Sequence, residues 1–574
     1  MKFTHEKFSN YFRIFFLFYA DNSNAITSNS KFLKQSIIPE PVKVIPGEGS
    51  FDINENTLIV ASDVDQLRSA AFLNGYISKY YGFKLKVVSK TPKAKSSKNG
   101  NLQFINLSVI NIADSYAVYS PADLKKEGAY ALTIKDGVAN LSGANPQGLF
   151  YAVQTLIQLL PTIKPNPEPG SKSLSLPVQS VEVIDFPRFE YRGMHLDVVR
   201  HIFSVDYVKQ YIDYLALHKM NYFHWHLTDD QGWRMESKKY PKLNEIGSWR
   251  AGTIIGMFPG TGLDSTRYGG FYTIEQMKDV INYAADRYIT IVPEIDIPGH
   301  CMALIASFPQ FSTTPNIHKE PAITWGMFNR ENNVLAPSEE VFAFLKDVYN
   351  ELMDVFPGQY IHVGGDECAK KWWKESPETQ DFMKKHGLKD ELELQSYFIK
   401  RVSEVVKGRG RTIVGWEEIM EGGLVEGSIV MNWRNHKSGL QAAQKGYKTI
   451  LAPGKYSYMN NAQKRNEDSL GPKRYLPVDS VYLFEPVPEG FPETAAANIM
   501  GGQGCMWTEY FPNKERLEYT LFPRFSAISE VFWTQSKNKN WPKFQLKLID
   551  QFNRYDLWGT NYSTEIFRSG DYSR

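Results

Sequence analysis

A chain of 574 residues is too long for one ordinary hydrophobic core, so we expect two or three domains. Its net charge of +2 at pH 7 argues against nucleic acid and against a polybasic membrane surface, and favours a neutral partner. The composition, 42% hydrophobic and 14% aromatic, is that of a globular protein, and three cysteines cannot form a disulfide framework in a chain of this size.

Residues 1–25 resemble a secretory signal. Lys2, Lys7 and Arg13 precede the apolar stretch IFFLFYA, and a Ser-x-Ala cleavage motif ends at Ala25. We therefore expect export to the periplasm, to the medium or to a lysosome-like compartment. Because the apolar stretch is short and the basic segment is long, a disordered tail is the alternative. No other stretch is long and apolar enough to span a membrane.

Residues 36–185 are predicted to form a small α/β domain that ends in a linker. Three segments have the pattern of strands, NTLIVAS, LQFINLSVI and AYALTIKDGVANLSG, and the last is a hairpin that turns at Asp136-Gly137. Residues 145–160 have helical spacing, with their apolar side chains on one stripe. The stretch 161–177 is rich in Pro and Ser, which is typical of a linker.

Residues 186–535 repeat a strand–loop–helix pattern. Eight segments have the pattern of strands: YRGMHLDV, NYFHWHL, TIVPEIDI, YIHVGGDE, TIVGWEE, SIVMNW, KTILAPG and NIMGGQGCMW. Helical segments lie between most of them, and one helix over 515–533 closes the series. Eight strands alternating with helices over about 350 residues predict a (β/α)8 TIM barrel. We expect residues 536–574 to be a C-terminal extension that packs on the barrel.

The active site of such a barrel lies at the C-terminal ends of its strands. Polar and aromatic side chains end or follow every predicted strand, in chain order: Asp197, Arg200 and His201; His224, His226, Asp229, Asp230 and Trp233; Glu294, Asp296 and His300; Asp366 and Glu367; Trp416; Trp433; Tyr456, Tyr458 and Asn460; Trp507 and Glu509. Such a gathering at one rim is difficult to explain as packing, so it predicts the functional site.

The aromatic side chains at this rim indicate a sugar ligand. Pyranose rings present apolar C–H faces that stack on aromatic rings, and a tryptophan follows nearly every strand. Arg200 is suited to clamp vicinal hydroxyls with its planar guanidinium. A salt bridge from Arg200 to Asp197 or to another rim acid is the alternative for that residue.

The adjacent carboxylates Asp366 and Glu367 differ from the pair found in most glycosidases, whose two carboxyls lie several ångströms apart across the sugar. Successive side chains at a strand end point in different directions, so these two would reach different parts of one ligand. This favours Glu367 as general acid and Asp366 as the residue that orients a 2-acetamido group, whose carbonyl oxygen is the nucleophile. We expect burial to raise the pKa of Glu367, and polar neighbours to keep Asp366 ionised.

Six motifs in order, YRGMHLDVVRHIF, NYFHWHLTDDQGWR, PEIDIPGH, HVGGDE, GWEEI and GGQGCMWTEY, resemble those of the family 20 glycoside hydrolases, the β-N-acetylhexosaminidases. The segment 145–160 also resembles the end of the small domain that precedes the barrel in this family. The resemblance implies an exo-acting enzyme that releases terminal non-reducing β-linked GlcNAc or GalNAc with retention, through an oxazolinium intermediate. It implies no metal or other cofactor, and a homodimer is compatible with it.

The resemblance also implies a role for each matched residue. Glu367 matches the general acid/base, Asp366 the residue that polarises the acetamido group, and Asp229 with His300 a charge-coupled pair that supports Glu367. The residues matched to substrate binding are Arg200 for the C3 and C4 hydroxyls, Trp416, Trp433 and Trp507 for the aromatic walls, Tyr458 for the acetamido carbonyl, and Glu509 for the C4 and C6 hydroxyls. Asn460 stands where this family often has Asp, which leaves the choice between GlcNAc and GalNAc open.

Two other classes of function compete with this reading. A metal-dependent hydrolase would use the imidazoles of HWH with nearby acids at the rim, although the tryptophans and Arg200 have no role around a metal. A non-catalytic carbohydrate-binding barrel would be expected to have lost Asp366, Glu367 or Tyr458, and all three are present.

Overall fold

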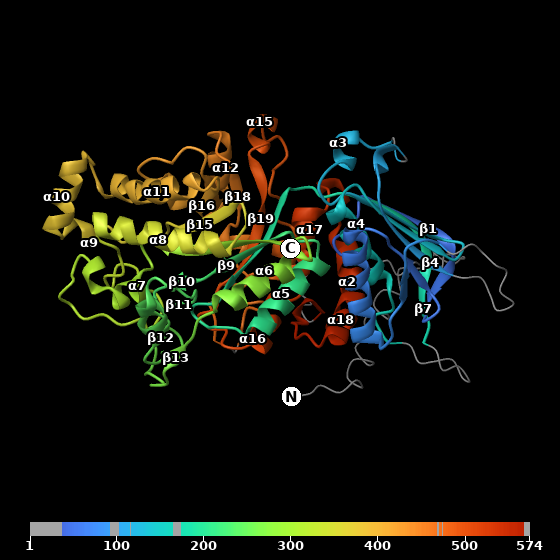
Figure 1. Ribbon diagram of the computed structural model, residues 1–574, viewed down its shortest axis with the longest axis horizontal. Coiled ribbons are helices and arrows are strands. Elements are labelled where there is room, and N and C mark those ends of the chain that lie inside the picture. The colour runs from blue at the N-terminus through green and yellow to red at the C-terminus, as the bar shows by residue number, and fades with distance from the viewer. Residues whose placement is uncertain are drawn as a thin grey trace. The chain divides into compact units, whose positions relative to one another are not determined.

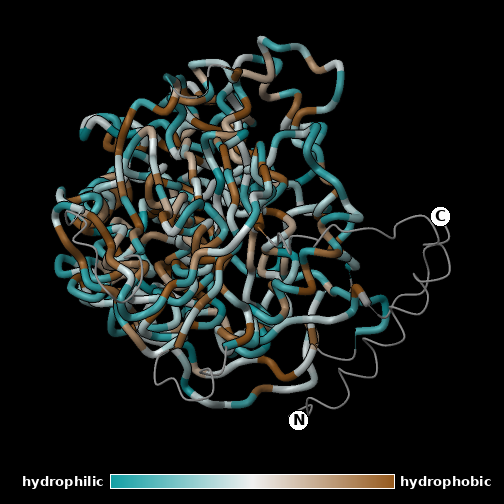
Figure 2. Tube along the Cα trace, turned by 90° about the vertical axis from the view of Figure 1, so that its right-hand side faces the viewer, coloured by the Kyte–Doolittle hydropathy of each residue, from teal (hydrophilic) through white to brown (hydrophobic). Residues whose placement is uncertain are grey.

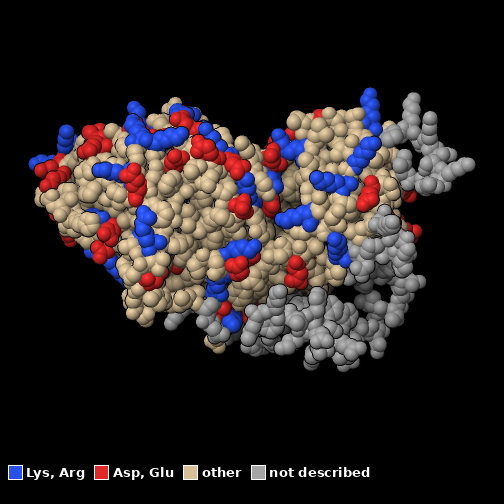
Figure 3. Space-filling model, turned by 60° about the horizontal axis from the view of Figure 1, so that its bottom comes forward, with Lys and Arg blue, Asp and Glu red and all other residues tan. Residues whose placement is uncertain are grey.

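The computed structural model describes residues 37–91, 103–114, 116, 118–164, 174–467, 470–472 and 474–567. The predicted signal, residues 1–25, and the middle of the predicted linker lie outside the described residues, so export stays a prediction from the sequence. Among the helices of the described part, none has the length and apolarity needed to cross a membrane. Acidic and basic side chains are interspersed on the face shown in Figure 3.

The N-terminal part is a seven-stranded sheet with helices packed on it (Figure 1). Its strands lie in the order β1-β7-β5-β6-β4-β2-β3. Their bounds are β1 Lys43–Ile53, β2 Leu58–Val60, β3 Lys86–Val88, β4 Phe104–Val109, β5 Tyr130–Lys135, β6 Val138–Gly143 and β7 Leu176–Asp185. The expected hairpin is confirmed as β5–β6, and the left-handed backbone at Asp136 (φ 52°) and Gly137 (φ 77°) makes its tight turn.

Two helices, α2 (Val64–Tyr81) and α4 (Pro146–Leu159), pack against each other beside this sheet. Both begin where a side chain caps the free backbone N–H groups. Asp63 accepts from the N–H of Asp65 and of Gln66, and Asn145 accepts from that of Gly148. The helix predicted at 145–160 is therefore confirmed as α4, almost entirely buried.

The second part is a closed barrel of eight parallel strands, which confirms the predicted (β/α)8 fold. Its strands are β8 Tyr191–Asp197, β9 Tyr222–His226, β14 Thr290–Ile297, β15 Tyr360–Gly364, β16 Thr412–Trp416, β17 Ile429–Asn432, β18 Thr449–Leu451 and β19 Ile499–Met506. Strand β19 pairs with β8 and so closes the barrel. All eight coincide with the segments predicted from the sequence. Two short hairpins lie outside the barrel sheet: β10 Thr228–Asp229 with β11 Gly232–Trp233, and β12 Trp249–Arg250 with β13 Tyr268–Gly269.

Helices surround the barrel, and Figure 1 shows α8 and α11 running side by side outside it. The longer ones are α5 Val205–Leu217, α6 Ile274–Ala285, α8 Glu339–Val355, α10 Pro377–His386, α11 Glu391–Gly408, α12 His436–Gln444, α16 Lys514–Leu521 and α17 Arg524–Trp533. The single closing helix expected over 515–533 is wrong. It is split into α16 and α17 at Phe522-Pro523, because proline has no backbone N–H to continue the helical hydrogen bonding.

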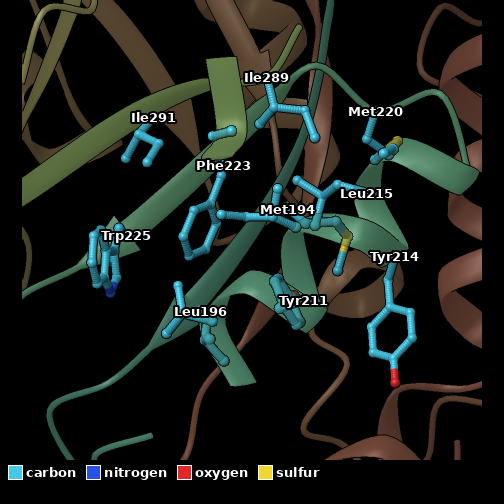
Figure 4. Close-up of a cluster of buried hydrophobic side chains, with 14 of the residues drawn as sticks. Met194, Leu196, Tyr211, Tyr214, Leu215, Met220, Phe223, Trp225, Ile289 and Ile291 are labelled. Carbon is cyan, nitrogen blue, oxygen red and sulfur yellow. The ribbon is translucent and has the colours of Figure 1, made fainter. Parts of the chain in front are cut away.

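The barrel core is made where amphipathic helices cover apolar strands. Figure 4 shows Tyr211 and Leu215 of α5 facing Met194 of β8 and Phe223 of β9. All four are fully buried. Apolar and polar stretches alternate along the described chain (Figure 2), as expected when each helix buries only one face.

Buried polar contacts join the small domain to the barrel. The ammonium of Lys219, which follows α5, lies 3.1 Å from Asp185 Oδ2 and donates to the Tyr130 hydroxyl at 2.8 Å. The indole of Trp533, at the end of α17, donates to the same carboxylate. Within the predicted C-terminal extension, α18 (Trp541–Trp558) contacts both parts: its Lys547 lies 2.9 Å from Glu40, and its Tyr555 hydroxyl lies 2.7 Å from Ser526 Oγ of α17.

Candidate active site

Strand β15 delivers Asp366 and Glu367 to the C-terminal rim of the barrel through a double glycine. Gly364 (φ 67°) and Gly365 (φ 96°) adopt the left-handed backbone that glycine tolerates. A methyl group at Gly364 would overlap Asp296 Oδ1, and one at Gly365 would lie 2.6 Å from Ile419. The two glycines therefore let the chain turn sharply while the neighbouring strand stays close.

The two carboxylates occupy different environments. The side chain of Asp366 is 13% exposed, whereas that of Glu367 is 42% exposed. Glu367 itself has a positive φ of 44°, a conformation that is uncommon outside glycine and recurs at functional sites. His300 lies between them: its Nε2 is 3.5 Å from Glu367 Oε2 and 3.7 Å from Asp366 Oδ2. One imidazole thus faces both acids.

A buried chain of charged groups lies behind His300. The His300 Nδ1 is 3.1 Å from Asp229 Oδ1, and His226 Nε2 is 3.0 Å from the other oxygen of the same carboxylate. Arg200 also approaches Asp229 at 2.7 Å and Asp197 at 3.1 Å, so the salt bridge considered for Arg200 is present. Its Nε donates to Gln231 Oε1 at 2.8 Å, which leaves the guanidinium held on several sides.

The directions of the pKa shifts contradict the prediction for the two acids. The hydrogen bond from His300 lowers the pKa of Glu367 below its usual range, against the opposing effect of burial. Burial raises the pKa of Asp366 to about 6, although the His300 imidazolium opposes this. The physical reason is that Glu367 is the more exposed acid and accepts from a cation, whereas Asp366 is nearly enclosed. His300 remains protonated because Asp229, among other acids, outweighs burial and raises its pKa.

Four aromatic side chains stand at the same rim. The ring centroid of Trp507 lies 5.9 Å from that of Trp416 and 6.2 Å from that of Tyr458. Trp433 is nearly parallel to Tyr458, with an interplanar angle of 16° and centroids 6.3 Å apart. The structure therefore brings together the four residues that the sequence assigned to the aromatic walls and the acetamido group.

Several buried polar atoms at the rim have no hydrogen-bond partner among the residues that the structure describes. Three acceptors among them are Asp366 Oδ1, Asn460 Oδ1 and Glu509 Oε2. A buried acceptor without a partner costs about 1–3 kcal/mol, which a protein tolerates where a ligand supplies the donor. All three belong to the predicted site residues, and a sugar offers hydroxyl and N–H donors for them.

Two carboxylates outside the predicted site set also contact its members. Glu418 accepts from the Trp433 indole at 2.9 Å, and Glu294 accepts from the Trp416 indole at 2.9 Å. Burial and the neighbouring Asp366 raise the pKa of Glu418 to about 8. The sequence signal for Glu418 was present in GWEE, where two acids follow a strand that ends in tryptophan. The sequence places Glu294 at a strand end but indicates no role for it.

Three clusters among the described residues have the composition of metal ligands: His195, His224 and Glu294; Asp229, Asp230 and His300; and Asp296, His300 and Asp366. The second and third require His300 as a ligand. Both ring nitrogens of His300 already face carboxylates: its Nδ1 lies 3.1 Å from Asp229 Oδ1 and its Nε2 lies 3.5 Å from Glu367 Oε2. In addition, Arg200 and His226 already contact Asp229, so this donor set favours hydrogen bonding over metal ligation.

Comparisons with known proteins agree on one family. Residues 189–536 match the catalytic domain of glycosyl hydrolase family 20, and residues 34–185 match domain 2 of that family. A beta-hexosaminidase from Porphyromonas gingivalis is 38% identical over 92% of this chain and 64% of its own length. One from Vibrio furnissii is 36% identical over 70% of this chain and 65% of its own length, so the chain spans just under two thirds of both relatives.

A solved structure supports the same assignment. The GH20 exo beta-N-acetylglucosaminidase from Vibrio harveyi, in complex with N-acetylglucosamine, matches with a TM-score of 0.78 and 30% identity. The match covers 94% of this chain and 80% of that one. Together with the closed barrel and the small preceding domain, these matches show that the chain belongs to glycosyl hydrolase family 20.

Proposed function

We propose that the protein is an exo-acting β-N-acetylhexosaminidase that releases terminal β-linked GlcNAc or GalNAc by substrate-assisted catalysis. The observation that carries the proposal is the arrangement of Asp366 and Glu367: two adjacent acids in different environments, both facing His300, beside an aromatic rim. The relatives named as beta-hexosaminidases support the same activity.

The first step divides the work between the two acids. Asp366 accepts the acetamido N–H, so that the carbonyl oxygen attacks C1 and forms the oxazolinium ring. As the C1–oxygen bond of the glycoside breaks, Glu367 transfers its proton to the leaving oxygen. In the second step water attacks C1 and gives a proton to Glu367. The attack breaks the bond between C1 and the acetamido oxygen, so the oxazolinium ring opens. Two inversions at C1 give net retention.

Substrate binding reconciles this division with the pKa order of the protein. A sugar ring over the rim excludes water from Glu367, and burial disfavours its charged form, which raises its pKa. The acetamido N–H donates to Asp366, which stabilises the charged form and lowers its pKa. The ligand thus moves both acids toward the states that the reaction needs.

The rest of the rim supports recognition of one terminal sugar. Arg200, Asn460 and Glu509 supply a cation and two unpartnered acceptors for hydroxyl groups. The loop between β12 and β13 is tied down beside this rim: the N–H of Phe258 donates to the hydroxyl of Tyr510, next to Glu509. Exo action is supported by the similarity to the exo beta-N-acetylglucosaminidase from Vibrio harveyi.

Two assays test this function. We expect the purified protein to release 4-nitrophenol from 4-nitrophenyl N-acetyl-β-glucosaminide, and to shorten defined N-acetylglucosamine oligomers by one terminal sugar at a time. Binding without turnover would establish a non-catalytic carbohydrate-binding barrel instead. Loss of turnover on dialysis against a chelator, with recovery on adding a divalent metal, would establish a metal-dependent hydrolase.

A further inference from the structure

Glu294 of β14 is a fully buried carboxylate that gathers nitrogen atoms from four side chains. The indole of Trp416 donates to Oε1 at 2.9 Å, and His226 Nδ1 contacts Oε2 in a short hydrogen bond. Two more imidazoles face it: His362 Nδ1 lies 2.9 Å from Oε1, and His224 Nε2 lies 3.0 Å from Oε2.

The charges around Glu294 fix its ionisation. Burial opposes the charged form, but the imidazoles of His362, His226 and His224 outweigh it and hold the pKa of Glu294 well below its usual range. In the other direction, Glu294 and Asp229 overcome burial and raise the pKa of His226 to about 10. Glu294 and His226 are therefore a buried ion pair, and removing either partner leaves the other charge uncompensated.

Each oxygen of Glu294 leads to a different part of the site. From Oε1 the hydrogen bond runs to Trp416, an aromatic wall of the proposed acetamido pocket. From Oε2 a short hydrogen bond leads to His226. His226 lies 3.0 Å from Asp229, which lies 3.1 Å from His300. His300 in turn lies 3.5 Å from Glu367. One carboxylate thus holds both the wall that positions the nucleophile and the far end of the chain that supports the acid.

We propose that Glu294 is a positioning residue that couples the orientation of Trp416 to the proton-donating chain ending at Glu367; this rests on the proposed function. The coupling follows from the rigidity of a carboxylate: its two oxygens move together, so a displacement of His226 displaces the acceptor of Trp416. Asp366 and Glu367 must act in concert when the ring closes and the leaving group departs. Because Glu294 contacts both Trp416 and His226, it keeps the groups that support the two acids in fixed relative positions.

The test uses E294Q, W416F and two substrates: N,N′-diacetylchitobiose, called chitobiose below, and 2,4-dinitrophenyl N-acetyl-β-glucosaminide. E294Q removes the negative charge that pairs with His226 and keeps a single acceptor oxygen, so either the ion pair alone is lost or the Trp416 hydrogen bond is lost with it. We expect E294Q to lower kcat about tenfold on the dinitrophenyl glycoside and about a further tenfold on chitobiose, whose leaving group needs the acid. W416F removes the indole donor and part of the aromatic wall but leaves the chain from His226 to Glu367 in place, so it is expected to lower kcat by the same factor on both substrates.

The double variant E294Q/W416F measures the coupling. Because both changes act on the carboxylate contact that joins Trp416 to His226, the double variant is expected to lose less on the dinitrophenyl glycoside than the product of the two single losses. The proposal would be overturned if the losses in kcat of the two single variants multiply in the double variant. It would also be overturned if E294Q lowers kcat by the same factor on both substrates. The matched control is H224Q, which changes another neighbour of the same carboxylate outside both routes. It is expected to leave the ratio of the two kcat values unchanged.

Two measurements keep the test decisive if E294Q does not fold or if the wild type has no activity. For the first case, H226Q interrupts the contacts that lead to Glu367, and W416F interrupts the contact with the aromatic wall. H226Q is then expected to lower kcat more on chitobiose than on the dinitrophenyl glycoside. If the losses of H226Q and W416F multiply in the double variant H226Q/W416F, the coupling is overturned. For the second case, the ¹H–¹⁵N indole signal of Trp416, assigned by its absence in W416F, is expected to shift in E294Q. An unmoved signal refutes the anchor, whereas an inactive wild type refutes only the proposed function.

Discussion

His300 Nε2 lies 3.5 Å from Glu367 Oε2 while its Nδ1 lies 3.1 Å from Asp229, so one protonated imidazole joins the exposed acid of the rim to a buried anion. This relationship explains why the more exposed acid has the lower pKa. A cation at this distance stabilises the carboxylate of Glu367 by charge and by hydrogen bonding. The proposed reaction begins only when the substrate overcomes that preference.

Glu367→Gln tests the role of the general acid. A glutamine cannot supply a proton, so we expect kcat on chitobiose to fall by about 10²–10⁴-fold, the usual contribution of general acid catalysis. On 2,4-dinitrophenyl N-acetyl-β-glucosaminide, whose leaving group departs without a proton, the fall should be far smaller. Steady-state kinetics on both substrates check this, and equal losses on the two would contradict the role.

Asp366→Asn tests the residue that orients the acetamido group. The change removes the charge that stabilises the oxazolinium cation, so we expect about 10²–10³-fold lower kcat on both substrates, including the activated one. The melting temperature should stay close to that of the wild type, because burial disfavours the Asp366 charge in the protein. Near-wild-type turnover of the dinitrophenyl glycoside by D366N would show that the nucleophile does not depend on Asp366.

The pKa order predicts opposite pH profiles for two kinds of substrate. The reaction needs free enzyme in which Asp366 is ionised and Glu367 is protonated. The pKa of Asp366 is about 6, and the pKa of Glu367 lies below its usual range. For chitobiose, kcat/KM should therefore peak below pH 6 and fall about tenfold per pH unit above it, as the active form becomes scarce. For the dinitrophenyl glycoside, which needs only ionised Asp366, kcat/KM should rise through pH 6 to a plateau. A dinitrophenyl profile that already reaches its plateau well below pH 6 would show that the order is reversed.

Gly364→Ala tests the turn that delivers the two acids. The positive φ disfavours any side chain, and the added methyl overlaps Asp296 Oδ1, so we expect a loss of at least about 3 kcal/mol in the free energy of unfolding or a failure to fold. Gly387→Ala is a suitable control because its φ is the same, 67°, and no atom lies within 4 Å of the added methyl. Denaturant unfolding of both variants separates the overlap from the backbone cost; equal losses would show that Asp296 does not constrain the turn.

Much of the fold could be predicted from the sequence because periodicity is a local signal. The eight barrel strands and helix α4 follow from runs of apolar residues with a fixed spacing, which buried strands and amphipathic helices require. The break at Pro523 was available in the sequence as well, but an apolar pattern on both sides of it suggested one helix.

The site could be predicted only as a set of residues. Parallel strands bring their ends to one rim, so Asp229, His300 and Glu367 could be expected near one another without any distance. Their ionisation could not be predicted, because the pKa of each acid depends on which group the tertiary structure places within 4 Å of it. Glu294 shows the same limit: its position in the strand is evident, whereas its contacts with Trp416 and His226 arise from two other strands.

The central claim is that the acetamido oxygen of the substrate is the nucleophile. Replacing the N-acetyl group of the 4-nitrophenyl glycoside by mono-, di- and trifluoroacetyl groups withdraws electrons from that oxygen while leaving the glycosidic bond and the leaving group unchanged. We predict that kcat/KM falls with each added fluorine, by at least about tenfold over the series. A rate that does not change along the series would contradict substrate assistance and assign the nucleophile to the protein.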